Sequence, residues 1–262
     1  MHQAPGLTNA ELHAFARDGF VFPVPVLEPA EIEDLRRRVD AIRARLDELA
    51  PSLYEVERGY TERPDEVVCH FLGGWRVDSA LRALVFDPRI TIPCAQALGV
   101  ERLRLWHDQV FYKPPRHLGV VPWHQDYSYW QRAQPANHVT LNLMLDDATL
   151  ESGCVHFVPG SHRHGLLPKA RFDGPMDQVT AARGAVPAVV RAGQASIHHS
   201  HTVHGSHANT SDRPRRALVF NYMGARTRCA DGTTPLLKGV PLVREGEVID
   251  GEFFPIVLDR SK

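Results

Sequence analysis

The spacing of apolar residues changes near residue 100, and this change limits the folds available to the chain. Before it, apolar residues recur at steps of three and four, as over residues 32–49, which predicts amphipathic helices. From Glu101 the period becomes two, because Leu103, Leu105 and His107 share one face of a strand. A mainly β fold follows: a double-stranded β-helix of the jelly-roll or cupin-like type, with the N-terminal helices packed outside. Further short strands are expected at 138–145, 154–159, 186–190, 194–199 and 216–223, between turns rich in glycine, proline, aspartate and serine.

No linker, internal repeat or low-complexity tract interrupts the chain, so one domain is expected over residues 1–262. Its parts are a mostly helical region at 1–100, the jelly-roll core at 101–223 and a C-terminal extension at 224–262. Residues 54–75 lack periodicity and combine charged and aromatic residues with a Gly-Gly pair. Such a segment is typical of a loop, and here it is a candidate lid.

The composition narrows the possible partners. A formal net charge of −1 gives no global positive field, which argues against nucleic acid and anionic membranes as partners. No signal sequence and no apolar run of about 18 residues is present, so neither export nor membrane spanning is expected. The four cysteines contain no C-x-x-C pair, which favours a reducing, cytoplasmic location over a disulfide framework. The oligomeric state is left open, but 15 histidines justify a search for a metal site.

His124 and Asp126 give the first chemical signal. Residues i and i+2 of a strand point to the same side, so this pair can present an imidazole and a carboxylate to one ion. A third ligand would come from the histidine-rich segment at 198–207. Two histidines and one carboxylate form the facial set that leaves open positions on ferrous iron. His199 and His201 form a second i, i+2 pair, for which core packing is the competing interpretation.

Several short motifs then occur in a fixed order along the chain. They are Tyr112-Lys113-Pro114-Pro115, Trp123-His124-Gln125-Asp126, Glu151-Ser152-Gly153-Cys154, Pro159-Gly160-Ser161-His162, His204-Gly205-Ser206 with Asn209 and Ser211, and Arg215. Together with the N-terminal pattern that begins at Leu7, they resemble the phytanoyl-CoA dioxygenase family of 2-oxoglutarate oxygenases. The resemblance extends from about Leu7 to Met223.

The resemblance implies a site of defined composition. His124 and Asp126 become the proximal ligands of iron(II) and His204 the distal ligand. Arg215, assisted by Ser206, is expected to hold the far carboxylate of the cosubstrate 2-oxoglutarate, which suits a guanidinium fork. A turn after His204 should return the next strand so that Arg215 lies beside it. The remaining cosubstrate-side positions are Lys113, Gln109 and Thr140, while Asn142 replaces a tryptophan that many relatives have.

The implied reaction consumes O2 and 2-oxoglutarate, releases succinate and carbon dioxide, and hydroxylates a small molecule. Asp126 argues against halogenation, because halogenases of this class leave that coordination position free for a halide. Desaturation, cyclisation or epimerisation would use the same site. A zinc or manganese hydrolase, a cupin-like isomerase or sugar-binding module, and a metal-free binding protein are the alternatives from other classes. Substrate choice is expected in the loops at 54–75, 127–130 and 224–239, because the inward strand positions are committed to metal and cosubstrate.

Overall fold

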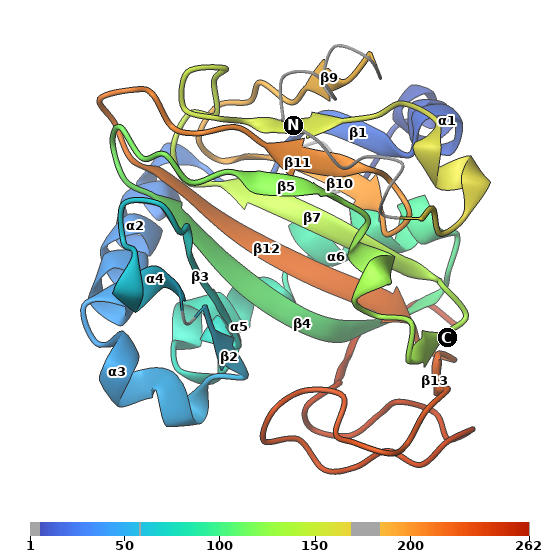
Figure 1. Ribbon diagram of the computed structural model, residues 1–262. Helices are drawn as coiled ribbons and strands as arrows, with labels where there is room; N and C mark the ends of the chain where they lie inside the picture. The colour runs from blue at the N-terminus through green and yellow to red at the C-terminus, as the bar shows by residue number, and fades with distance from the viewer. Residues whose placement is uncertain (1–5, 58, 169–183, 262) are drawn as a thin grey trace.

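Two antiparallel sheets face each other in the computed structural model, which describes residues 6–57, 59–168 and 184–261 (Figure 1). The larger sheet has eight strands in the order β1-β10-β7-β12-β4-β3-β2, with β14 also paired to β4. The long strands β4 and β12 form its centre. The bounds are β1 (Phe20–Pro25), β2 (Glu55–Val56), β3 (Cys69–Leu72), β4 (Arg102–Lys113), β7 (His138–Met144), β10 (Gln194–His199), β12 (Arg215–Gly224) and β14 (Ile256–Asp259).

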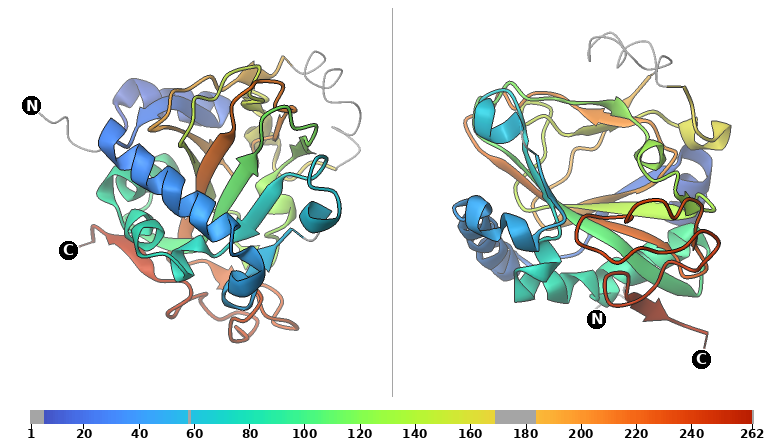
Figure 2. Two further views of the ribbon diagram at one scale, coloured as in Figure 1. Left: turned by 90° about the vertical axis from the view of Figure 1, so that its left-hand side faces the viewer. Right: turned by 60° about the horizontal axis from the view of Figure 1, so that its bottom comes forward.

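The smaller sheet has the order β5-β11-β8-β9 and lies opposite the larger one (Figure 2). From β4 onward the chain alternates between the sheets: β5 is in the smaller, β7 in the larger, β8 in the smaller, and β10, β11 and β12 continue the alternation. This alternation is the double-stranded β-helix expected from the sequence, so the fold class is confirmed. The bounds are β5 (Val121–His124), β8 (Val155–Phe157), β9 (Val186–Pro187) and β11 (His204–Ser206), and a separate pair joins β6 (Ala133–Gln134) to β13 (Arg228–Cys229).

The N-terminal helices lie outside this core, as expected. In α1 the capping box between Thr8 and Glu11 satisfies backbone donors of the first turn, and Gly19 ends the helix with φ 87°. The helical periodicity of residues 32–49 is divided between two helices by a turn at Ala44 and Arg45. The helices are α1 (Asn9–Asp18), α2 (Pro29–Arg43), α3 (Leu46–Leu49), α4 (Gly59–Glu62), α5 (Ser79–Val85) and α6 (Pro88–Leu98), and the 3-10 turns are η1 (Ala50–Ser52), η2 (Gly74–Arg76), η3 (Asp126–Ser128) and η4 (Ser161–His164). No helix in the described ranges is long and apolar enough to cross a membrane.

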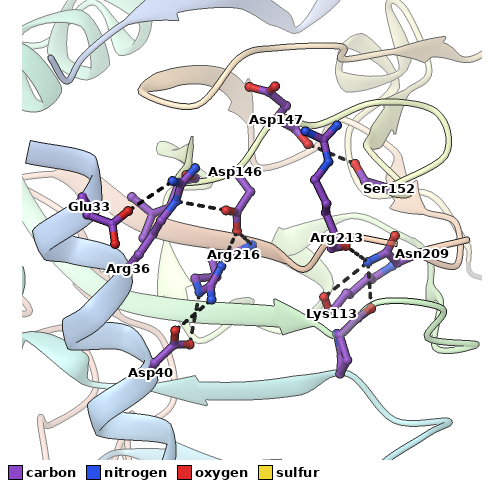
Figure 3. Close-up of polar contacts among 12 residues, drawn as sticks. Glu33, Arg36, Asp40, Lys113, Asp146, Asp147, Ser152, Asn209, Arg213 and Arg216 are labelled. Atoms are coloured by element: carbon purple, nitrogen blue, oxygen red, sulfur yellow. Dashed lines mark hydrogen bonds and ion pairs between the residues drawn. The ribbon is translucent and has the colours of Figure 1, made fainter. Parts of the chain in front are cut away.

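Ion pairs attach α2 to the outer face of the larger sheet (Figure 3). Arg216 of β12 lies between Asp40 of α2, at 2.8 Å, and Asp146, at 2.9 Å. Arg36, also on α2, contacts Asp146 at 3.0 Å. The Arg216 side chain is only 12% exposed. Because solvent screens such largely buried charges weakly, this cluster holds α2 on the sheet.

The expectation of a loop at 54–75 was wrong for part of that segment. It contains β2, α4, β3 and η2, and β3 pairs with β4 through Cys69↔Tyr112 and Leu72↔Gln109. The strand is only four residues long, too short to establish a period by itself. Pairing with the long β4 therefore makes residues 69–72 a strand, and the sequence of the segment alone does not show this pairing.

Candidate metal centre and its pocket

His124 and His204 are brought together by strand pairing. Each is the other's partner in the antiparallel pair β5–β11, and the centroids of their rings are 4.2 Å apart. Asp126 follows where β5 has ended and η3 begins, so the pair is not on one continuous strand as the spacing suggested. The three residues still meet, because potential ligand atoms of His124, Asp126 and His204 all lie within 4.8 Å of one another. Within the described ranges this is the one such group of histidine, cysteine or acidic residues.

Hydrogen bonds orient both imidazoles toward the centre. Nδ1 of His124 lies 2.8 Å from the carbonyl oxygen of Pro122, and Nδ1 of His204 lies 3.0 Å from that of Thr202. Because a carbonyl can only accept, each Nδ1 carries the proton, and each Nε2 keeps its lone pair. The two Nε2 atoms lie 3.5 and 3.6 Å from Oδ1 of Asp126. Metal-binding histidines are commonly held in this way, so the donor set fits a divalent ion.

The protonation states also suit a ligand set. Burial, followed by the imidazoles of His124 and His198, lowers the pKa of His204 well below its ordinary value and keeps this ring neutral. Burial alone would raise the pKa of Asp126, but the contacts with His204, His124 and His198 hold it well below its usual range. An ionised carboxylate beside a neutral imidazole is the state in which these two groups bind a metal.

His198 is a third histidine at this centre, and it was not singled out from the sequence. Its Nε2 lies 3.0 Å from Oδ2 of Asp126, and its side chain is buried. The usable signal was the period of two along β10, which places His198 on the face of Ser196, opposite to His199. His199, by contrast, accepts the backbone N–H of His201 at Nδ1, so this alternative chelating pair lacks a free ring nitrogen there.

A pocket opens between the two sheets, and every expected site residue except Lys113 lines it. Arg215 is 3% exposed, and its Nη1 donates to the carbonyl of Gly153. Its Nε has no hydrogen-bond partner within the described residues. Burial lowers the pKa of Arg215 to about 10, so the guanidinium stays charged at neutral pH. A buried cation with an unused donor fits an anionic group that enters this pocket.

Lys113 supports the same end of the pocket from within the protein. Its ammonium donates to Oγ of Ser206 at 2.9 Å and to the carbonyl of His207. Burial, and then the charge of Arg215, lowers the pKa of Lys113 well below its ordinary value. Lys113 and Arg215 are direct partners in the pairing of β4 with β12, so the two basic side chains are neighbours. The charged Arg215 makes this position electropositive. Of the two residues in the Lys113–Ser206 contact, Ser206 is the one that faces the pocket.

Arg215 and His204 lie on different walls of the pocket. Arg215 begins β12 of the larger sheet, whereas His204 begins β11 of the smaller one. The expectation that the returning strand pairs beside His204 was therefore wrong, because the intervening turn carries the chain from one sheet to the other. Asn209 holds this turn: its Nδ2 donates to the carbonyls of Pro114 at 2.7 Å and Arg213 at 2.8 Å (Figure 3).

Between the metal ligands and Arg215, the larger sheet presents neutral side chains. Asn142 is 8% exposed and lines the pocket, and its Oδ1 has no partner among the described residues. Gln109 lines the pocket as well, and its Oε1 lies 2.7 Å from Nε2 of His70. Thr140, expected on the cosubstrate side, also lines the pocket, and its hydroxyl lies 2.6 Å from Oδ2 of Asp126.

The aromatic residues that follow the ligands divide into core and rim. Tyr127 and Trp130 are buried in the main apolar core, whereas Tyr129 is 75% exposed. The ring of Tyr129 meets that of His124 edge to face, with centroids 5.9 Å apart. Tyr129 therefore stands at the rim beside a metal ligand. Residues 224–239 do not line this pocket; part of that stretch accepts hydrogen bonds from Arg132 instead.

Comparison with protein families gives a match to a known family. The model described as "Phytanoyl-CoA dioxygenase (PhyH)" matches residues 15–217. This range includes β1, both sheets up to Ala217, and all of the expected metal and cosubstrate residues.

Curated proteins and solved structures agree with this match. The ectoine dioxygenase of Halomonas elongata is 29% identical over 246 residues, which covers 86% of this chain and 72% of that protein. The methylphosphonate hydroxylase of Gimesia maris is 29% identical over 220 residues, which covers 82% of this chain and 80% of that protein. Among solved structures, the non-heme alpha-ketoglutarate-dependent carbocyclase SnoK from nogalamycin biosynthesis superposes with a TM-score of 0.75 at 25% identity, and the match covers 97% of each chain.

Proposed function

The chain belongs to the phytanoyl-CoA dioxygenase family of iron- and 2-oxoglutarate-dependent oxygenases, and from this premise we propose that it hydroxylates an unactivated C–H bond of a small molecule. Succinate and carbon dioxide are the expected by-products. The observation that carries the proposal is the convergence of His124, Asp126 and His204, within 4.8 Å, in a pocket that also contains a buried arginine.

His124, Asp126 and His204 are the proposed iron ligands. Two imidazole nitrogens and one carboxylate oxygen leave three coordination positions open on an octahedral ion. Bound ferrous iron and 2-oxoglutarate supply the oxidising chemistry, in which dioxygen is consumed and the cosubstrate becomes succinate and carbon dioxide. The chain's own residues bind the metal and the cosubstrate, orient the substrate and exclude water, as protein groups do around a reactive cofactor. Asp126 also argues against halogenation, because its carboxylate takes the position that a halide would need.

Arg215 is the proposed partner of the far carboxylate of 2-oxoglutarate. It is buried, charged and neighboured by Lys113, and no carboxylate of the described residues is paired with it. Ser206 offers a hydroxyl that Lys113 already polarises through a 2.9 Å hydrogen bond. Gln109 and Thr140 line the wall between this position and the metal ligands. This distribution leaves the open end of the pocket, near Tyr129, for the substrate.

A second outcome at the same site is ring formation. It is favoured by the likeness to a carbocyclase, which covers 97% of the chain. The pocket offers little else to separate the two outcomes, because its described lining contains no carboxylate besides Asp126 and no lysine that could act as acid or base. Product analysis distinguishes hydroxylation, which adds an oxygen atom to the substrate, from cyclisation, desaturation and epimerisation, which do not.

Succinate formation with ferrous iron and 2-oxoglutarate tests the proposal. Asp126→Ala and His204→Ala are each expected to reduce both iron binding and succinate formation to background. His164→Ala is the matched control, because His164 is an exposed histidine outside the pocket. Full iron occupancy and normal turnover in either ligand variant would exclude that residue as a ligand. A zinc or manganese hydrolase, or a non-catalytic barrel, would form no succinate at all.

The primary substrate is best sought in a metabolite screen that reads 2-oxoglutarate consumption. Ectoine and methylphosphonate are the first compounds to include, since two relatives are named for them. The four buried, free cysteines suit a reducing compartment, and we propose a cytoplasmic location for the enzyme.

A further inference from the structure

A row of polar side chains crosses four neighbouring strands beneath the metal ligands. The register pairs His198 of β10 with Thr140 of β7, Thr140 with Asn221 of β12, and Asn221 with His107 of β4. All four side chains are almost completely buried, with exposures of 2%, 3%, 0% and 2%. Cross-strand partners on one face of a sheet touch, so the row is continuous. Buried polar groups are costly unless they are hydrogen-bonded, which calls for a reason for this row in the core.

Hydrogen bonds connect the row to Asp126. Oδ2 of Asp126 lies 2.6 Å from the hydroxyl of Thr140 and 3.0 Å from Nε2 of His198. The hydroxyl of Thr140 lies 2.9 Å from Oδ1 of Asn221. Nδ2 of the same amide lies 3.1 Å from Nδ1 of His107. The two imidazoles are therefore the ends of a chain of contacts that includes the second oxygen of the carboxylate.

The direction of these bonds follows from counting protons. A threonine hydroxyl has one proton, and the short contact with an ionised carboxylate requires that proton to point at Asp126. The structure turns Oδ1 of Asn221 to Thr140 and Nδ2 to His107. The single hydroxyl proton of Thr140 calls for the reverse orientation, with the NH2 group toward Thr140 and the oxygen toward His107, since the surrounding bonds decide which end of an amide is which. Nδ1–H of His107 then donates to that oxygen. Burial lowers the pKa of His107 to about 3, so this ring is neutral and carries one proton.

We propose that His107, Asn221, Thr140 and His198 are positioning residues that make Asp126 a one-oxygen ligand. In this row of hydrogen-bonded side chains every donor points toward Oδ2 of Asp126, which receives one bond from Thr140 and one from His198. Oδ1, which faces Nε2 of both His124 and His204, is left for the metal. The inference rests on the proposed function and deepens it.

The consequence is a free coordination position. A carboxylate that binds through both oxygens would occupy one position more than a carboxylate that binds through one. With Oδ2 held by two donors, the His-Asp-His set uses three positions and leaves three, which 2-oxoglutarate and dioxygen require together. The row thus protects the access of both cosubstrates to the metal without touching either of them.

Metal titration tests the inference without reference to turnover. Thr140→Val removes the hydroxyl with little change in shape, and Mn²⁺ affinity measured by calorimetry should fall about 10- to 100-fold, as for other partners of metal ligands. Thr140→Ser restores the donor and should return the affinity to within about threefold of the original. Thr227→Val is the matched control, because Thr227 is equally buried and bonded, to the carbonyl of Gly224, but lies outside the pocket.

The second donor provides an independent pair of variants. His198→Phe keeps a ring but removes the donor, whereas His198→Gln keeps an N–H that can reach Asp126; only the first should weaken Mn²⁺ binding. This pair carries the test if Thr140→Val does not fold. The binding of 2-oxoglutarate to the Mn²⁺-loaded variants is the second readout, and the loss of a free position should lower it in Thr140→Val and His198→Phe.

Two failures can be told apart. If the original protein binds no Mn²⁺, the proposed function is overturned. If it binds Mn²⁺ and Asp126→Ala does not, but Thr140→Val and His198→Phe bind Mn²⁺ and 2-oxoglutarate like the original, only the positioning role is overturned.

Discussion

Two consecutive arginines of β12 lie on opposite faces of the larger sheet. Arg215 faces the pocket and uses one donor on the carbonyl of Gly153, whereas Arg216 faces α2 and pairs with Asp40 and Asp146. The period of two along a strand is the cause of this division. The Arg216 side chain, 12% exposed, lies between acids of two elements. The pair therefore offers one variant for cosubstrate binding and one for stability.

Arg215→Ala is expected to weaken 2-oxoglutarate binding about 10- to 150-fold, because it removes a charge-assisted pair worth about 1.5–3 kcal/mol. Titration of the Mn²⁺-loaded protein with 2-oxoglutarate measures this, and Mn²⁺ affinity itself should change little. Equal titration curves for the variant and the original protein would show that another group holds the carboxylate.

Arg216→Ala is expected to lower the free energy of unfolding by about 1.5–3 kcal/mol, because it removes hydrogen bonds to two charged partners. Affinity for 2-oxoglutarate in the folded variant should stay unchanged. Urea denaturation and the same titration provide the two measurements. A loss of 2-oxoglutarate binding with unchanged stability would reverse the assignment of the two arginines.

His138 makes stability depend on acid. It is 0% exposed, neither ring nitrogen has a partner among the described residues, and burial lowers its pKa to about 3. An unfolded histidine titrates near 6.5, so between about pH 3 and 6.5 the unfolded chain binds the extra proton. The free energy of unfolding therefore decreases as pH falls through this window, and His138 contributes up to about 1.4 kcal/mol per pH unit to this decrease.

His138→Leu should reduce that slope, measured by urea denaturation at a series of pH values between 4 and 7. The exposed His13→Leu serves as the control and should leave the slope unchanged. An identical slope in His138→Leu and the original protein would mean that His138 gains its proton in the folded state as readily as in the unfolded state.

At the scale of elements, the sequence predicted what is locally encoded. The capping box of α1, the glycine that ends it and the strand at 194–199 all have local signals, and the structure contains them. The strand β3 does not, because its partner β4 lies more than thirty residues away. The sheet to which each strand belongs is likewise not local, which explains why His204 and Arg215 were expected on neighbouring strands.

The same distinction applies to the site. Motif order led to His124, Asp126 and His204, and the structure brings them together. His198, Asn221 and His107 were not found, because strand register alone joins them to the row of contacts that ends at the carboxylate. A register can be read from the structure, but several short strands with similar periods do not determine it from sequence.

The segment between β2 and β3 is the remaining candidate for a lid. The carbonyl of Asp65 accepts a hydrogen bond from the backbone N–H of Leu118 at 3.3 Å. Nε2 of His117 lies 3.0 Å from the carbonyl oxygen of Pro64. His117 and Leu118 precede Val121, which lines the pocket, by only a few residues in the chain. We expect hydrogen exchange at 59–68 to slow when substrate binds, whereas β3, bonded to β4, should be protected throughout. Unchanged exchange at 59–68 during saturating turnover would exclude a lid there.

At the scale of the whole molecule, metal binding should stabilise the fold. The ligands come from β5, η3 and β11, and the carboxylate is bonded to side chains of the larger sheet, so one ion connects both sheets. Adding Mn²⁺ at 100 times its dissociation constant should stabilise the protein by about 2.7 kcal/mol, seen as a higher Tm. Chelation should reverse the shift, and Asp126→Ala should show none. A shift that persists in Asp126→Ala would indicate a different metal site.

We also propose that the whole chain folds as one domain, since β1, near the N-terminus, and β14, near the C-terminus, complete the same sheet.

The polar row beneath the carboxylate also makes the enzyme unequally tolerant of changes in chain length. Removing one residue from β7 would exchange Thr140 for its neighbour Val139 or Leu141 and turn every following side chain to the other face. Asp126 would then lose its hydrogen bonds to the polar row, even though the sequence still contained all three metal ligands. An insertion in a rim loop leaves that pairing intact. Descendants of this chain are therefore freer to change substrate by lengthening loops than by altering the inner strands, and a lineage can acquire new chemistry at the rim while its metal centre stays the same.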